Sequence, residues 1–118
     1  MEAALEHLLR SPVALAVVTR GTGRVVVVNR AFTELTGHAE RDLVGRVVPV
    51  SIVGTRALVH GGESSFTDIT LATRADGIVT RVVVSVAPLR DGAEEPRHCI
   101  VLLREVHGDR EAFECESA

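Results

Sequence analysis

The first quarter of the chain alternates between apolar runs and glycine-rich breaks. VALAVVT (residues 13–19) and VVVV (residues 25–28) are almost wholly apolar, and the stretch RGTGR lies between them. Short apolar runs that end in turn residues are typical of strands with both faces covered. We therefore predict a β-hairpin over residues 13–28.

The spacing of apolar residues becomes helical directly after this hairpin. Asn29 can cap a helix that begins at Arg30, because its side-chain oxygen can accept a hydrogen bond from a free backbone N–H group of the first turn. Gly37 suits the left-handed conformation that ends a helix. The face of this short helix that we expect to be buried carries Phe32, Leu35 and Thr36.

Three further short helices are predicted. AERDLVG has acidic residues at its start, Leu43 and Val44 as buried positions and Gly45 as its end. A weaker helix is expected over residues 51–60. At the N-terminus, residues 2–9 have amphipathic spacing, and Pro12 blocks their continuation.

The second half of the chain changes to a period of two, which is typical of strands. Strands are predicted over residues 65–74, 78–88 and 98–106, and Ala75-Asp76-Gly77 is a hairpin turn because Asp-Gly tolerates positive φ. In the first of these strands, we expect Ile69 and Leu71 to share a face. In the second strand, the face opposite Arg81 and Ser85 carries Ile78, Val82, Val84 and Val86.

The order of these elements predicts an α+β fold. Two strands, short helices and three strands indicate a five-stranded antiparallel sheet, made of two hairpins joined edge to edge, with the helices on one face. We assign residues 1–10 to an N-terminal amphipathic helix, 11–106 to the domain and 107–118 to an acidic tail. The other sheet face is also apolar, so we expect this helix and a partner subunit to cover it. The predicted dimer interface comprises Leu5, Leu8, Leu9 and Val83.

Composition narrows the classes of function. The net charge of -3 gives no electrostatic footprint for direct nucleic-acid binding. All thirteen basic residues are arginines, which excludes Schiff-base chemistry and a phosphate-loop lysine. No run approaches the roughly 18 apolar residues of a membrane span, so we expect a cytoplasmic protein without a membrane partner. Cys99 alternates with apolar residues and is expected to be buried and inert, whereas Cys115 lies in the polar tail.

Two stretches resemble the PAS domain family. VVVVNRAFTELTGHAERDLVG is similar to the strand, Asn, Phe-containing helix, Leu-Thr-Gly and Leu-x-Gly of that family, and RADGIVTRVVVSVAPLRDG is similar to its Asp-Gly hairpin and Ser-Val-x-Pro-Leu ending. The resemblance implies a sensory domain for signal transduction, which senses a small ligand and forms a homodimer. It also implies an effector domain or signalling protein as the partner.

A ligand pocket is expected between the sheet and the helices, because some members of the family hold haem, flavin or a small metabolite there. The candidate pocket residues are Asn29, Phe32, Leu35, Leu43, Val53, Leu58, His60, Ile69, Leu71 and Val84. Asn29 has a second interpretation, as a helix cap only. An anionic ligand could bind arginines, and the candidates are Arg46, Arg56, Arg74 and Arg81.

The cofactor is left open by the sequence. Flavin is disfavoured, because the segment after the Leu-x-Gly helix has no cysteine and the chain has no Trp, no Tyr and three Phe. Haem needs an axial ligand such as histidine, and His60 is the best-placed candidate, although a solvated helix-end residue is the simpler interpretation. No spacing of ligands predicts a metal site.

No set of nucleophile, base and orienting group is apparent, so we predict that the chain is not an enzyme. Two alternatives stay open. One is a ligand-free module for dimerisation or docking. The other is a small enzyme that uses the same cavity.

Overall fold

The computed structural model describes residues 6–7, 9–54, 56–57, 65–89 and 96–106. Its strands and helices follow the predicted order closely. In chain order they are β1 (Ala14–Thr19), β2 (Val25–Val28), α2 (Arg30–Thr36), α3 (Glu40–Leu43), α4 (Val50–Val53), β3 (Phe66–Thr73), β4 (Val79–Leu89) and β5 (His98–Glu105). No helix among these described residues has the length and apolar character needed to cross a membrane.

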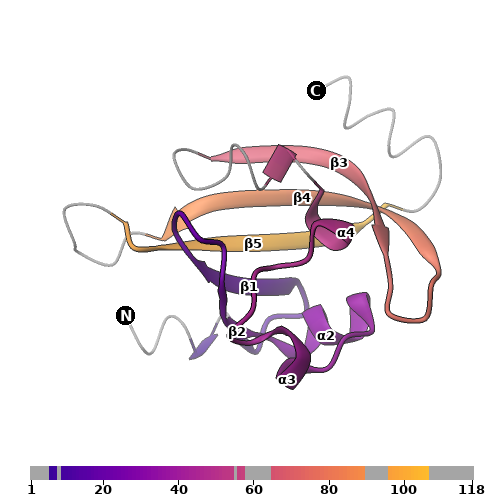
Figure 1. The fold of residues 1–118 in the computed structure, drawn as a ribbon, viewed down its shortest axis with the longest axis horizontal. Coiled ribbons are helices and arrows are strands. Elements are labelled where there is room, and N and C mark those ends of the chain that lie inside the picture. The colour runs from indigo at the N-terminus through magenta and orange to yellow at the C-terminus, as the bar shows by residue number, and fades with distance from the viewer. Residues whose placement is uncertain (1–5, 8, 55, 58–64, 90–95, 107–118) are drawn as a thin grey trace.

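The five strands form one antiparallel sheet in the order β2-β1-β5-β4-β3 (Figure 1). The two hairpins meet at the centre, where β1 pairs with β5 from Ala14 opposite Leu103 to Thr19 opposite His98. This pairing joins residues 79 to 89 positions apart in sequence, so the centre of the sheet depends on contacts between distant parts of the chain. The predicted fold class and the edge-to-edge joining of the hairpins are confirmed.

The helices cover one face of the sheet, which we call the inner face. Helix α2 packs beside β1, α3 beside β2 and α4 beside β3. Each helix contributes one fully buried apolar side chain, namely Phe32, Leu43 and Ile52. From the strands, the inner face contributes Ala16, Val18, Val82, Val84, Val86, Val101 and Leu103. Burial of these apolar groups is the main stabilising contribution to the fold.

The opposite sheet face, the outer face, is apolar as predicted. Leu15 and Val17 are buried there although they lie outside the inner core cluster. Further half-buried apolar side chains on this face are Val83, Ala87, Ile100 and Leu102.

The turn between β3 and β4 has the predicted form. Gly77 has φ 87°, and Asp76 Oδ1 accepts a hydrogen bond of 3.0 Å from Ile78 N. The backbone N–H of Ala75 donates to the carbonyl of Thr36 at 2.9 Å. This contact ties the turn to the C-terminal end of α2.

Ile69 and Leu71 share a face of β3 as expected, but the expectation that they line the pocket is wrong. Ile69 pairs with Val83 and Leu71 with Arg81, and these positions of β4 point away from the helices. Leu71 is 60% exposed. The inner face of β3 instead carries Phe66, Asp68, Thr70 and Ala72. The register with β4 sets the face of this edge strand, and a slip of one residue exchanges the two faces.

Two other expectations about burial are also corrected. Val44 is 38% exposed and Ile78 is 60% exposed, because Val44 follows the end of α3 and Ile78 precedes the start of β4. Neither residue lies within a regular element that would direct it into the core.

The predicted helix over residues 51–60 is shorter in the structure. Helix α4 ends at Gly54, whose φ of 84° and ψ of 158° are not helical. Arg56 and Ala57 are helical again, and residues 58–64 lie outside the described part. A Cβ atom at Gly54 would lie 2.9 Å from Thr70 Oγ1. Glycine therefore allows the end of α4 to approach β3 closely.

We expect Gly54→Ala to destabilise the protein by about 2–4 kcal/mol, because alanine disfavours this backbone conformation and its Cβ would contact the Thr70 hydroxyl. Gly77→Ala is the matched control, since Gly77 also has positive φ but a Cβ there meets nothing within 4 Å. Urea unfolding measures both variants. Equal destabilisation of the two would contradict the importance of the close approach to Thr70.

Candidate functional site

Asn29 joins β1 to the start of α2. Its Oδ1 accepts hydrogen bonds from Leu15 N and Phe32 N, both at 2.9 Å. Its Nδ2 donates to the carbonyl of Val13 at 2.7 Å, with a longer contact of 3.4 Å to Ser11 O. The backbone N–H of Asn29 also donates to Leu15 O at 3.0 Å. Backbone groups use both ends of this buried amide. Asn29 is therefore a helix cap, which was the second of its two interpretations.

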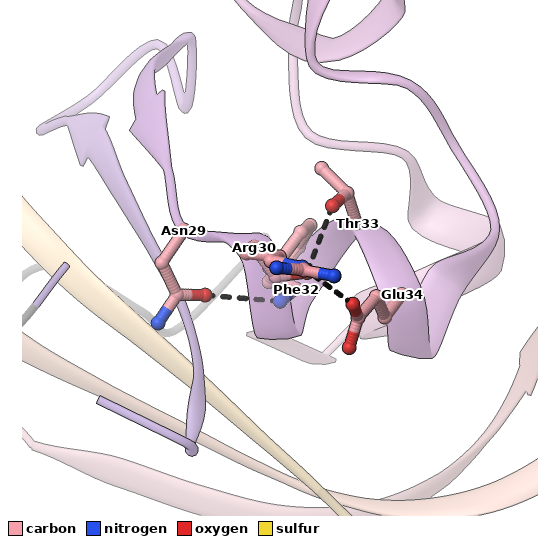
Figure 2. A network of polar contacts seen from close by, with 5 residues as sticks. All are labelled: Asn29, Arg30, Phe32, Thr33 and Glu34. Carbon is pink, nitrogen blue, oxygen red and sulfur yellow. Dashed lines mark hydrogen bonds and ion pairs between the residues drawn. The ribbon is translucent and has the colours of Figure 1, made fainter. Parts of the chain in front are cut away.

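Figure 2 shows how Asn29 begins α2, with the bond from its side-chain oxygen to Phe32 N. The ion pair between Arg30 and Glu34 follows on the solvent side at 2.7 Å. At the other end of the helix, Gly37 has φ 74° and its N–H donates to Thr33 O. The predicted start and end of this helix are confirmed. Phe32, three residues after the cap, is thereby directed into the core.

A cavity of about 200 Å³ lies between the inner face of the sheet and the segment around α4. Strands β1, β4 and β5 form its floor, the turn between β1 and β2 forms its rim, and the residues of its roof are Val47, Val48, Val53 and Ala57. The lining residues are Val18, Thr19, Arg20, Gly21, Thr22, Gly23, Val47, Val48, Val53, Ala57, Val86, Cys99 and Val101. Most of these side chains are small and apolar, so the cavity suits a small ligand that is largely apolar.

The polar groups of the cavity come mainly from the turn between β1 and β2. The hydroxyl groups of Thr19 and Thr22 form a hydrogen bond with one another. Arg20 is half-buried, and its Nη1 contacts the carbonyl of Pro96 at 3.4 Å. The backbone N–H of Arg20 donates to Arg97 O at 2.8 Å. These bonds hold the turn against the start of β5.

Cys99 contributes a thiol to the cavity wall. It is 2% exposed and forms no disulfide, which confirms the prediction that it is buried. Burial raises the pKa of the Cys99 thiol above its ordinary value of 9.0, and the positive charge of Arg20 partly opposes this rise. The thiol is therefore protonated and weakly nucleophilic at neutral pH.

The predicted pocket residues are distributed over several places. Val53 lines the cavity. Three others, Phe32, Leu43 and Val84, belong to the packed core. Leu35 lines a separate groove of about 360 Å³, which is formed by Pro12, Val13, Ala14, Ala31, Leu35, Leu103, Arg104 and Glu105. Ile69 and Leu71 lie on the outer face, as described above, and therefore do not line the cavity.

Several predicted residues fall outside the described part of the chain. Leu58 and His60 are among them, as are Leu5 and Leu8 of the proposed interface and the tail of residues 107–118. Of the N-terminal helix, Glu6, His7 and Leu9 are described as helical, and Leu9 is half-buried. In the ranges that are described, no group of three or more His, Cys, Asp or Glu side chains could hold a metal ion.

The rim of the cavity was missed from the sequence. RGTGR was interpreted as a turn only, yet its residues 20–23 border the cavity. One signal was present, because the five residues RGTGR, two of them arginines, are more than the two-residue turn that a tight hairpin needs. That this turn faces α4 follows only from the three-dimensional arrangement.

This sheet order, with short helices over one face and a cavity beneath them, defines the class of small α+β sensory domains. The PAS fold family matches residues 1–106. The chain therefore belongs to the PAS family, as its sequence motifs indicated. PAS domains are sensory domains that typically act in signal transduction, and they commonly dimerise and connect to effector domains such as histidine kinases.

Solved structures with the same fold agree with this assignment. A light-oxygen-voltage domain studied with a flavin analogue is 18% identical, with TM-score 0.77 over 98% of this chain and 93% of its own. The light-oxygen-voltage domain of a blue-light activated histidine kinase from Erythrobacter litoralis is 21% identical, with TM-score 0.69 over 84% of this chain and 100% of its own.

A PAS domain from a two-component sensor histidine kinase is 19% identical, with TM-score 0.68 over 89% of this chain and 95% of its own. At these identities the likeness shows the fold alone. A comparison with curated proteins finds no match.

The expectation that flavin is disfavoured is wrong. A light-oxygen-voltage domain studied with a flavin analogue has this fold over nearly the whole chain, and further structures with the fold are light-oxygen-voltage domains. The expectation depended on the small number of aromatic residues and on the missing cysteine after the second predicted helix. Neither feature determines the backbone arrangement of sheet and helices, which is what this chain shares with those structures.

We expect Asn29→Ala to lower the free energy of unfolding by about 2–4 kcal/mol, because two buried backbone N–H groups and one carbonyl lose their partner. Arg30→Ala is the matched control and should change it by less than about 0.5 kcal/mol, since its ion pair is exposed. Asn29→Asp keeps the accepting oxygen but removes the donor to Val13, and should lie between the two. Urea unfolding ranks the three variants by their free energy of unfolding. A change of less than about 0.5 kcal/mol in Asn29→Ala, as expected for Arg30→Ala, would contradict the importance of the Asn29 hydrogen bonds.

Cys99 should make stability depend on pH above 9. The raised pKa keeps the thiol protonated in the folded state while it ionises in the unfolded chain, so its contribution is complete below the ordinary value of 9.0. This contribution is lost as the pH rises through the raised value. In a Cys115→Ser background, the free energy of unfolding should therefore fall more steeply above pH 9 with Cys99 than with Cys99→Val. Parallel curves for the two proteins would refute this linkage.

Proposed function

We propose that this PAS domain senses a small ligand that binds in the cavity beneath α4. The observation that carries the proposal is the position of the cavity, whose floor is made by side chains of the two central strands. Val18 projects from β1, and Cys99 and Val101 project from β5. A ligand there contacts the pairing that joins the two halves of the sheet.

Occupancy of this cavity can be transmitted through the elements that form it. Val53 of α4 forms part of the roof, and α4 ends at the close approach of Gly54 to Thr70 on β3. Arg56 adds an ion pair of 3.6 Å with Asp68 on the same strand. A ligand that favours one position of the roof biases the sheet by its differential affinity for the two arrangements, typically about 1–3 kcal/mol.

Homodimerisation is the second part of the proposal. The half-buried apolar side chains of Val83, Ile100 and Leu102 share the outer face, and Leu9 of the N-terminal helix is half-buried as well. Association through this face would couple the dimer contact to β4 and β5, which also form the cavity floor. An effector domain or signalling protein would then respond to the change in the dimer.

The sensory proposal does not include catalysis. Among the described residues that line the cavity, Cys99 is the only thiol, and the cavity contains no carboxylate or imidazole side chain that could act as its base. The raised pKa of Cys99 also opposes a nucleophilic role.

A ligand-free docking module is the second candidate. The dense packing of the core favours it, because Phe32, Leu43 and Val84 are fully buried and fill positions that the sequence suggested for a ligand. In such a module, the outer face would carry the function and the cavity would have no role.

Native mass spectrometry and absorbance of the purified protein separate these two functions. We expect a retained small mass, or a ligand-dependent increase in Tm, together with the mass of a dimer. Ala57→Leu should abolish ligand retention, because Ala57 lines the cavity and the larger side chain fills it. Ala31→Leu is the control, since Ala31 lines the separate groove. A protein that retains no mass and whose Tm responds to no small molecule would favour the docking module.

A further inference from the structure

We propose that the ligand of this cavity is a small carboxylate with a short apolar tail, and that Arg20 binds its carboxylate group at the rim. The inference deepens the proposed sensory function and rests on it. It assigns a binding role to the turn between β1 and β2, which the sequence suggested only as a connection.

Charge is the first argument. Among the described residues that line the cavity, Arg20 has the only charged side chain, and no ion pair between described residues involves it. Its side chain donates a long hydrogen bond of 3.4 Å from Nη1 to Pro96 O. A guanidinium group carries five N–H donors in a planar arrangement that matches a carboxylate. A half-buried cation beside an apolar space therefore favours an anion.

The position of the Arg20 charge is the second argument. Arg20 and Cys99 line the same cavity, Arg20 at the rim and Cys99 in the wall. The Arg20 side chain therefore lies where it can interact with one end of a bound molecule. The backbone bond from Arg20 N to Arg97 O at 2.8 Å holds the residue in this place.

The hydroxyl pair at the rim is the third argument. Thr19 and Thr22 together carry two hydroxyl protons, and their mutual hydrogen bond uses one of them. Thr19 Oγ1 also accepts a hydrogen bond from Arg24 N at 3.1 Å. The second hydroxyl proton is available to a ligand oxygen. A carboxylate, which only accepts hydrogen bonds, fits this donor and the guanidinium group together.

The size and lining of the cavity limit the rest of the ligand. A volume of about 200 Å³ holds roughly six or seven non-hydrogen atoms, since a water-sized group occupies about 30 Å³. The walls beyond the rim are formed by valine and alanine side chains. A short aliphatic chain meets both limits.

The arginines suggested by the sequence are less suitable. Arg56 forms an ion pair with Asp68 at 3.6 Å, and Arg74 forms one with Asp76 at 3.7 Å. None of the four candidates, which are Arg46, Arg56, Arg74 and Arg81, lines the cavity. Arg20 therefore replaces these four arginines as the candidate for binding an anion.

Isothermal titration of the whole chain, freed of retained small molecules, with pentanoate and with 1-pentanol tests the inference. Pentanoate should bind, and 1-pentanol should bind about tenfold to a hundredfold more weakly, because it lacks the charge-assisted hydrogen bonds. Arg20→Gln should weaken pentanoate by a similar factor and leave 1-pentanol unchanged. Arg24→Gln is the matched control, since Arg24 belongs to the same turn but is exposed and does not line the cavity.

Circular dichroism confirms that each variant is folded. If Arg20→Gln is not folded, Arg20→Lys replaces it, and it should bind pentanoate with intermediate affinity because lysine keeps the charge but loses the planar pair of donors. Equal affinities for the acid and the alcohol, or an affinity for pentanoate that does not change in the Arg20 variants, would overturn the inference.

The outcomes also separate this inference from the proposed function. If the alcohol binds as well as the acid, the carboxylate class is wrong and the small-ligand cavity stands. If neither molecule binds but the native protein retains another mass, the carboxylate class is again wrong and the sensory function stands. If neither binds and no mass is retained, both proposals are wrong.

Discussion

The rest of the structure depends on the buried amide of Asn29, which connects strand β1 to helix α2. Its oxygen accepts from Leu15 N on β1 and from Phe32 N on α2, and its nitrogen donates to Val13 O. One side chain therefore sets the position of the first strand relative to the first helix. A buried amide with all its groups satisfied favours one geometry strongly, because any other arrangement leaves polar groups without partners.

The size of the side chains on the inner face distinguishes the densely packed part of the domain from the part that contains the cavity. Phe32 and Leu43 fill the space near α2 and α3 and are fully buried. Near α4, the side chains between roof and floor are valines, an alanine and a cysteine, and these leave about 200 Å³ unfilled. The chain has three Phe, no Trp and no Tyr, so large side chains are scarce. The same composition that argued against flavin stacking leaves space for a ligand.

The central pair of strands links this space to the outer face of the sheet. On β5, Cys99 and Val101 face the cavity while Ile100 and Leu102 face outward. A displacement of this strand moves side chains on both faces of the sheet, because successive residues of a strand point to opposite sides. In the proposed function, this strand would connect a molecule in the cavity directly to a partner on the outer face.

Local interactions made much of the fold predictable from the sequence. The asparagine cap, the left-handed Gly37, the Asp-Gly turn and the alternation of Val82, Val84 and Val86 depend on neighbours in the chain, and all are confirmed. The family could be recognised for the same reason, since its motifs are such local devices. Local chemistry also identified Cys99 as a buried residue.

Only the tertiary structure decided the face of β3 and the walls of the cavity. Ile69 and Leu71 are large apolar residues, yet the register with β4 directs them outward. Arg20 and Cys99 lie 79 positions apart in sequence and meet at the cavity because β1 pairs with β5. Register and long-range pairing are collective properties of the whole sheet, so no short stretch of sequence contains them.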